Sequence, residues 1–114
     1  MTTNKYCVSY KIAEMLKDKG FNKPTWAYYH DDKIVFGDKY NWNDIGLISA
    51  PTYPSVMEWF RKNHNLIIEV RVGEFDNNFL YTFSINGKEV KCKNYDSLEK
   101  SIEEAIKYCL EKLK

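Results

Sequence analysis

The fold is decided by two stretches of alternating residues, Leu66–Val72 (LIIEVRV) and Phe79–Gly87 (FLYTFSING). In each stretch an apolar residue stands at every second position, as in a strand with one buried face. The second stretch ends in Asn86-Gly87, the strongest short signal for a hairpin turn. A two-residue turn there predicts the cross-strand pairs Phe83 with Val90 and Tyr81 with Cys92. We therefore predict a three-stranded antiparallel meander with one apolar face.

A helix is expected after the meander, from about Ser97 to Leu113. Asp96 and Glu99 have the spacing of a capping box at its start. Its apolar residues recur every three or four positions, as on one face of a helix. They are Leu98, Ile102, Ala105, Ile106, Cys109, Leu110 and Leu113. We expect this helix to lie across the apolar face of the meander.

The N-terminal half is predicted to hold a helix and a hairpin. Ser9 can cap a helix that runs to Lys19, and Gly20 can end it. The hairpin joins Thr25–His30 to Lys33–Gly37 through a turn at Asp31-Asp32. Its expected pairs are His30 with Lys33, Tyr29 with Ile34, Tyr28 with Val35 and Ala27 with Phe36. One face then holds Ala27, Tyr29, Ile34 and Phe36, and the other holds Trp26, Tyr28, His30, Lys33 and Val35.

Residues 38–48 have no clear period and predict an ordered loop that carries Tyr40 and Trp42. A second helix follows, with Thr52 as its cap, Pro54 in its first turn and Asn63 to Asn65 at its end. Its apolar face is expected to consist of Tyr53, Met57, Phe60 and His64, with Val56 beside it. Trp59 falls off that face, so we expect it at the rim of the core or exposed.

These elements give an α+β fold in the order αββαβββα: a two-layer sandwich of an antiparallel sheet with helices packed on one face. The pattern leaves open whether the N-terminal hairpin joins the sheet of the meander. The chain has 114 residues, 44% of them hydrophobic and 29% charged, and no linker-like segment. We therefore expect a single domain over residues 1–114.

Charge and composition narrow the possible partners and compartments. The net charge is +1 with Lys and Glu interspersed, which disfavours nucleic acid and anionic membranes as partners. The chain begins without the apolar segment of a signal peptide and holds no membrane-spanning stretch. Its three cysteines are Cys7, Cys92 and Cys109, an odd number without metal-site spacing. We expect a cytoplasmic protein with reduced thiols.

Several short motifs carry a family resemblance over nearly the whole chain. They are Leu16–Phe21 (LKDKGF), Trp26–Tyr29 (WAYY), Ile48–Tyr53 (ISAPTY), Glu58–Asn65 (EWFRKNHN) and the Glu-rich last helix. In these the chain resembles a family of small uncharacterised proteins found in phages and mobile elements of gut bacteria. That family has no assigned function, so no catalytic residue is carried over. The resemblance implies an accessory protein of a mobile element.

Candidate chemistry is sparse. His30, Asp31 and Asp32 offer an imidazole and two carboxylates, which would suit a small metal-dependent hydrolase, although a polar turn explains them as well. His64, at a helix end, is better explained as a structural residue, and Cys7 is the cysteine nearest to a helix start. The sequence has no phosphate-binding glycine loop and no HExxH motif, and we expect no cofactor and no bound metal.

Aromatic residues make up 16% of the chain and provide the main candidate site. Large amphipathic side chains interspersed with polar ones are typical of interfaces and stacking sites. The candidate surface consists of Trp26, Tyr28, His30, Tyr40, Trp42 and Trp59. The first hypothesis is a non-enzymatic module that binds another protein or a second copy of itself there. The alternatives are the metal-dependent hydrolase and a single-stranded nucleic-acid binder that stacks bases on the hairpin.

Overall fold

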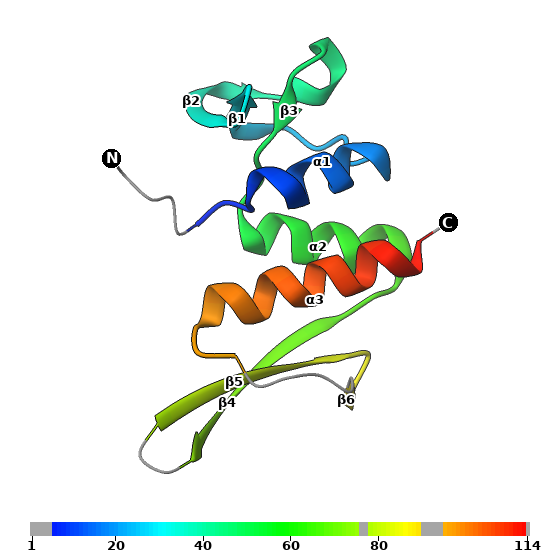
Figure 1. Cartoon of the computed structure of the whole chain (residues 1–114). Helices are drawn as coiled ribbons and strands as arrows, with labels where there is room; N and C mark the ends of the chain where they lie inside the picture. The colour runs from blue at the N-terminus through cyan, green and yellow to red at the C-terminus, as the bar shows by residue number, and fades with distance from the viewer. Residues whose placement is uncertain (1–5, 76–77, 90–94, 114) are drawn as a thin grey trace. The chain divides into compact units, whose positions relative to one another are not determined.

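The computed structural model describes residues 6–75, 78–89 and 95–113 (Figure 1). It divides into two compact units, Met1–Val56 with Leu113–Lys114, and Met57–Lys112. The boundary falls inside one helix, α2 (Tyr53–His64).

The first unit begins with helix α1 (Tyr10–Asp18), which starts and ends as predicted. The amide of Ile12 donates a hydrogen bond to the Ser9 hydroxyl at 3.4 Å, which caps the helix. Gly20 ends it with a φ of +89°, a left-handed conformation that favours glycine.

The predicted hairpin is also confirmed. Strands β1 (Thr25–His30) and β2 (Lys33–Tyr40) pair in the predicted register from Ala27↔Phe36 to His30↔Lys33. Asp31 takes the left-handed conformation of the turn, with a φ of +57°. Strand β2 runs three residues beyond its predicted end at Gly37, because the chain pairs again at Thr25↔Tyr40 after an irregularity.

The segment predicted as a loop contains two short elements. A 3-10 helix, η1, spans Trp42–Ile45, and strand β3 spans Ile48–Ser49. Strand β3 pairs with Tyr28 and Tyr29, which completes a sheet of order β2-β1-β3. A two-residue strand has too few positions to show alternation, so the sequence pattern missed it.

A small buried cluster of this unit lies on the Ala27 face of the hairpin. Cys7, Ala27 and Ala50 are buried there, with Tyr29 and Ile34 packed against them. The Tyr29 hydroxyl donates a hydrogen bond to the carbonyl of Val8 at 2.7 Å. This face of the hairpin is therefore the buried one, as predicted for its first three positions.

Helix α2 has the predicted limits but a different buried face. Thr52 caps it, since its Oγ1 accepts from the Ser55 amide at 3.4 Å, and Asn65 follows its end with a φ of +55°. The buried side chains are Tyr53, Val56, Trp59 and Phe60. The buried arc is therefore centred on Val56, whereas Met57 and His64 are only half-buried.

The second unit contains the predicted meander. Strands β4 (Ile68–Phe75), β5 (Asn78–Ile85) and β6 (Lys88–Glu89) form a sheet of order β4-β5-β6. Ile85 pairs with Lys88 across the two-residue turn, where Asn86 and Gly87 have φ of +55° and +79°. The predicted pairs that involve Val90 and Cys92 lie outside the described residues.

Helix α3 (Leu98–Lys112) contacts strands β5 and β4. Its cap is Ser97, whose hydroxyl accepts from the Lys100 amide at 3.1 Å, whereas Asp96 forms an ion pair with Lys100 at 3.0 Å. The stripe from Ile102 to Leu110 is buried as predicted, but Leu98 and, in strand β4, Val72 are exposed. Leu98 stands in the first turn of α3, before the buried stripe begins.

The α+β class and the predicted order of helices and strands are thus confirmed, with η1 and β3 as additions. The described strands form two sheets, so the N-terminal hairpin does not pair with the meander.

Candidate functional site

On the hairpin Trp42 packs against two of the other predicted aromatic residues, Tyr28 in a tilted stack and Tyr40 edge to face. The ring centroids of Tyr28 and Trp42 lie 4.4 Å apart, and those of Tyr40 and Trp42 lie 5.3 Å apart. Both Tyr28 and Trp42 lie over Gly37, where a Cβ would come within 3.5 Å of the indole and 3.6 Å of the phenol ring. The sequence placed Tyr28 on one face of the hairpin and Tyr40 and Trp42 in the loop that follows it. In the structure Tyr40 ends β2 and Trp42 begins η1.

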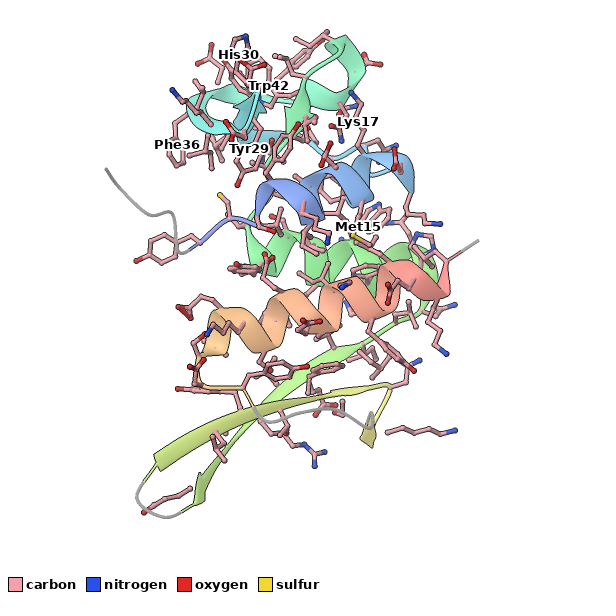
Figure 2. The ribbon with its side chains drawn as sticks, viewed as in Figure 1. Met15, Lys17, Tyr29, His30, Phe36 and Trp42 are labelled. Atoms are coloured by element: carbon pink, nitrogen blue, oxygen red, sulfur yellow. The ribbon has the colours of Figure 1, made fainter. Side chains whose placement is uncertain are left out.

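Trp42 is held in this stack by its indole N–H. Its Nε1 donates a hydrogen bond to the Thr25 carbonyl at 3.0 Å. The neighbouring Asn43 bonds to Ser49 through both backbone and side-chain atoms, at 3.1 and 2.8 Å. Figure 2 shows Trp42 and His30 on one side of the hairpin and Tyr29 on the other. Trp42 and Tyr28 are only half-exposed, so the stack mainly supports the hairpin.

A hollow of about 390 Å³ lies on the Ala27 side of the hairpin. Its exposed walls are large aromatic side chains: Tyr6 is 76% exposed, Trp26 62% and Phe36 66%. The other lining residues are Cys7, Pro24, Thr25, Ala27, Lys39, Ala50, Thr52 and Ser55. Lys39 is the charged side chain of this lining, and Cys7 and Ala50 lie in the buried core beneath it.

Trp26 and Phe36 line the same hollow, although the sequence placed them on opposite faces. The reason is the irregular pairing between β1 and β2, where the register passes from Ala27↔Phe36 to Thr25↔Tyr40. Three residues of β2, 37–39, therefore lie opposite a single residue of β1, Trp26. Such an irregularity is a β-bulge, and a bulge redirects the side chains beside it. Phe36 was predicted to belong to the apolar face, and its exposure is a correction. Gly37 within a strand was the available signal, because glycine there often marks a bulge.

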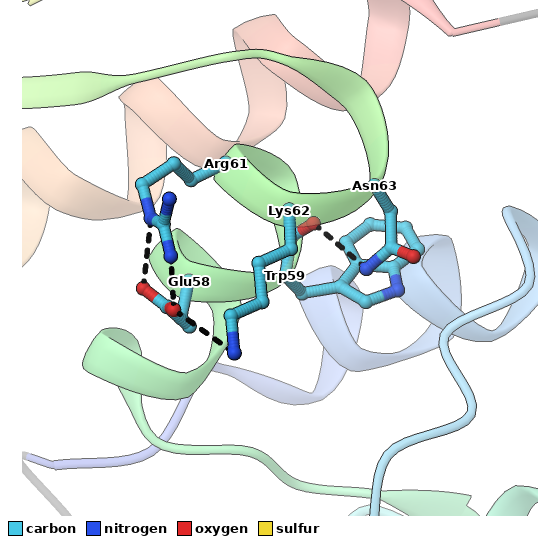
Figure 3. A network of polar contacts seen from close by, with 5 residues as sticks. All are labelled: Glu58, Trp59, Arg61, Lys62 and Asn63. Atoms are coloured by element: carbon cyan, nitrogen blue, oxygen red, sulfur yellow. Dashed lines mark hydrogen bonds and ion pairs between the residues drawn. The ribbon is translucent and has the colours of Figure 1, made fainter.

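Trp59 does not belong to this surface. It is only 5% exposed, and its ring lies 4.7 Å from that of His64 and 5.2 Å from that of Phe60. Figure 3 shows Asn63 donating to the Trp59 carbonyl, at 3.1 Å. The expectation of an exposed or rim position was wrong because the buried arc of α2 is centred on Val56. His64 packs against these rings, as expected of a structural histidine.

Next to Trp59, α2 carries an exposed ion-pair network (Figure 3). The Arg61 guanidinium donates to both carboxylate oxygens of Glu58, at 3.1 and 2.6 Å, and Lys62 Nζ lies 3.4 Å from Glu58. These contacts, above all the hydrogen bond from Arg61, lower the pKa of Glu58 from 4.5 to about 2. The network is thus fully formed at neutral pH.

The Glu58 network predicts a pH dependence. Because the carboxyl pKa is lower in the folded chain, its contribution to stability is present above pH 4.5 and is lost as the pH falls toward 2. An NMR titration of the Glu58 side-chain carbon is expected to find a midpoint well below 4.5. Arg61→Ala should raise that midpoint, and Lys107→Ala, on α3, should not. A wild-type midpoint near 4.5 would contradict the prediction.

Of the remaining candidate groups, Cys7 lines the hollow, whereas His30, Asp31 and Cys109 do not. His30 Nδ1 lies 3.9 Å from the Asp31 carboxylate, and both side chains are largely exposed. Among the described residues, no group of three His, Cys, Asp or Glu side chains could hold a metal ion. Cys7 and Cys109 are buried, and burial raises the pKa of the Cys109 thiol to about 12. Cys92 lies outside the described residues.

Comparisons with known protein families, curated proteins and solved structures give no match. Within the described part of the chain, no helix is long and apolar enough to cross a membrane. The function must therefore be inferred from the residues of the site itself.

Proposed function

We propose that this chain is a non-enzymatic protein-binding module whose hollow on the hairpin receives a segment of a partner protein. The observation that carries the proposal is the exposure of two large aromatic side chains, Trp26 and Phe36, at 62% and 66% on the rim of one hollow. Large aromatic side chains supply most of the binding energy at many protein interfaces. Their position beside a concave surface favours binding over chance exposure.

The size and lining of the hollow support a segment of a partner chain. About 390 Å³ lies in the range of sites that take a small ligand or one or two large side chains. The lining is mainly apolar but includes the hydroxyl side chains of Thr25, Thr52 and Ser55, and Lys39 supplies one positive charge. This chemistry fits a segment in which an aromatic or aliphatic side chain lies close to an Asp or Glu.

The support beneath the hollow favours a preformed site. Its floor includes Ala27 and Ala50, which are 1% exposed. The Thr25 hydroxyl donates to the Ala27 carbonyl at 2.7 Å, and Thr52 donates to Ser55 at 2.9 Å. Because these groups are already ordered, binding would cost little further conformational entropy. Tyr28 and Trp42 would support the hairpin from the opposite side.

The proposal includes a cellular context. We place the module in the cytoplasm, as an accessory protein of a phage or mobile element. The free, buried thiol of Cys109 fits a reducing compartment, and the resemblance in the motifs supports the context.

The proposal is tested by selecting peptides from a displayed library against the full chain and titrating them by calorimetry. Trp26→Ala and Phe36→Ala should each weaken binding at least about tenfold, because they remove a wall of the hollow. Lys39→Glu should weaken the binding of acidic peptides in particular. Val72→Ala is the matched control, since Val72 is 59% exposed but lies in the other unit.

Peptides that bind the Trp26→Ala, Phe36→Ala double variant as tightly as the wild type would contradict the proposal. Self-association of the wild type that is lost in Trp26→Ala would identify a second copy as the occupant of the hollow.

A further inference from the structure

Strand β4 (Ile68–Phe75) lies at the edge of the sheet in the second unit (Figure 1). Among the described residues it pairs only with β5, in one continuous register from Ile68↔Ile85 to Phe75↔Asn78. Glu69 and Arg71 to Glu74 are exposed. An edge strand of this length presents unpaired backbone groups that can receive another strand.

Two sets of hydrogen bonds show which residues direct their backbone outward. The Ile67 carbonyl accepts a hydrogen bond from the Asn86 amide at 2.9 Å, so the backbone polar groups of Ile67 point toward β5. On β5, Tyr81 exchanges two backbone hydrogen bonds with Tyr95, at 2.8 and 2.9 Å. The backbone polar groups of Tyr81 therefore point away from β4. Because directions alternate along a strand, Ile68, Val70 and Val72 point their N–H and C=O groups to the open edge.

The edge of β4 differs from the long edge in the first unit. Strand β2 carries Lys33 and Lys39 and an irregular register, which are common devices against edge pairing. Strand β4 (IEVRVGEF) has neither lysine nor proline, and its register is continuous. Its charged residues alternate in sign, with Glu69 followed by Arg71, and within the described part of the chain neither forms an ion pair.

We infer that β4 pairs antiparallel with β4 of a second copy of this chain, with Val70 at the centre. Edge pairing must place outward residues opposite one another, which limits the possible registers. Centring on Val70 sets Glu69 opposite Arg71 of the second copy, twice by symmetry. Centring on Glu69 or on Arg71 sets like charges opposite each other, and centring on Val72 sets Arg71 opposite Gly73. Among these registers, only the one centred on Val70 places both Glu69 and Arg71 opposite a residue of opposite charge.

The same register covers an exposed apolar side chain. Val72 is 59% exposed, although it lies on the sheet face that holds Ile68 and Phe83. With Val70 at the centre, Val72 stands opposite Ile68 of the second copy on that same face. Cross-strand neighbours of this kind are close enough to pack. Pairing would thus extend the apolar face across the two copies.

The proposal is tested by measuring the mass of the full chain by light scattering and sedimentation from about 1 μM to about 1 mM. We expect a rise from the monomer mass of 13.5 kDa to twice that value. Glu69→Arg and Arg71→Glu should each weaken the dimer at least about tenfold, because like charges then oppose each other twice. An equal mixture of the two variants should restore the dimer, since each then offers the charge that the other needs.

Circular dichroism of each variant shows whether it remains folded. The mixture provides a second check of folding, because two misfolded variants would not restore the dimer when combined. A wild type that stays at the monomer mass would overturn the proposal. Single variants that dimerise like the wild type, or a mixture that fails to dimerise, would overturn it too. Trp26→Ala should leave the dimer intact, which separates this edge from the hollow of the first unit; loss of the dimer in that variant alone would also overturn the proposal.

Discussion

Replacing Phe83 by alanine is expected to lower the free energy of unfolding by about 3–5 kcal/mol. Phe83 is 3% exposed on β5, and its ring centroid lies 6.3 Å from that of Tyr95 and 6.2 Å from that of Tyr108. Truncation removes the contacts of a whole ring and leaves a cavity between sheet and helix α3. Urea denaturation followed by circular dichroism measures the loss.

Phe36→Ala is the matched control, because it makes the same substitution at a position that is 66% exposed. It should cost less than about 1 kcal/mol, since little apolar surface of Phe36 is removed from water on folding. Equal losses in the two variants would contradict the assignment of Phe83 to the core and of Phe36 to the surface. Because Phe36 also lines the hollow, the control shows whether a binding defect in Phe36→Ala arises without loss of the fold.

Trp59→Ala is expected to destabilise the chain by about 3–5 kcal/mol and to lower the melting temperature by about 10–20 °C. The indole is 5% exposed and packs on His64 and Phe60, so its loss opens a large cavity. Scanning calorimetry measures the shift. Trp59→Phe should retain much of the stability, because it refills part of that volume.

Trp26→Ala provides the matched control for Trp59, since Trp26 is 62% exposed. Its melting temperature should stay close to that of the wild type. A small shift in Trp59→Ala together with a large one in Trp26→Ala would show that the two indoles have the opposite roles. The pair thus separates the tryptophan that stabilises the fold from the one proposed to bind.

The caps of α1 and α2 and the two-residue turns could be predicted because their signals are local, whereas α3 is capped by Ser97 and not by the predicted Asp96. Ser9 and Gly20 bound α1, and Asn86-Gly87 forms the turn with both residues at positive φ. In each case the residue type meets a need of the backbone within three or four positions. The register of the β1–β2 hairpin followed from its turn together with the apolar alternation. The register of β4 with β5 was not predicted, because the alternation ended at Val72 and the pairing continues to Phe75↔Asn78.

The candidate site was predicted only in part. Tyr28, Tyr40 and Trp42 were named together as large aromatic residues interspersed with polar ones, and Trp42 does pack against both tyrosines. Phe36, Tyr6 and Lys39 were missed, although they line the hollow with Trp26. A bulge changes which face a side chain joins, and no pattern of period two can show this, because the extra residues interrupt the period itself.

Local signals in the chain thus specify its helices, its two long hairpins and their order, since capping, turn geometry and periodicity act over a few residues. Three features required the folded structure: the division of the strands into two sheets, the burial of Trp59 and the meeting of Trp26 with Phe36 at one hollow. Each depends on contacts between residues far apart in the chain. Alternation and the helical period indicate which residues share a face of a strand or helix. Packing between distant elements decides which of these faces are buried and where the burial ends.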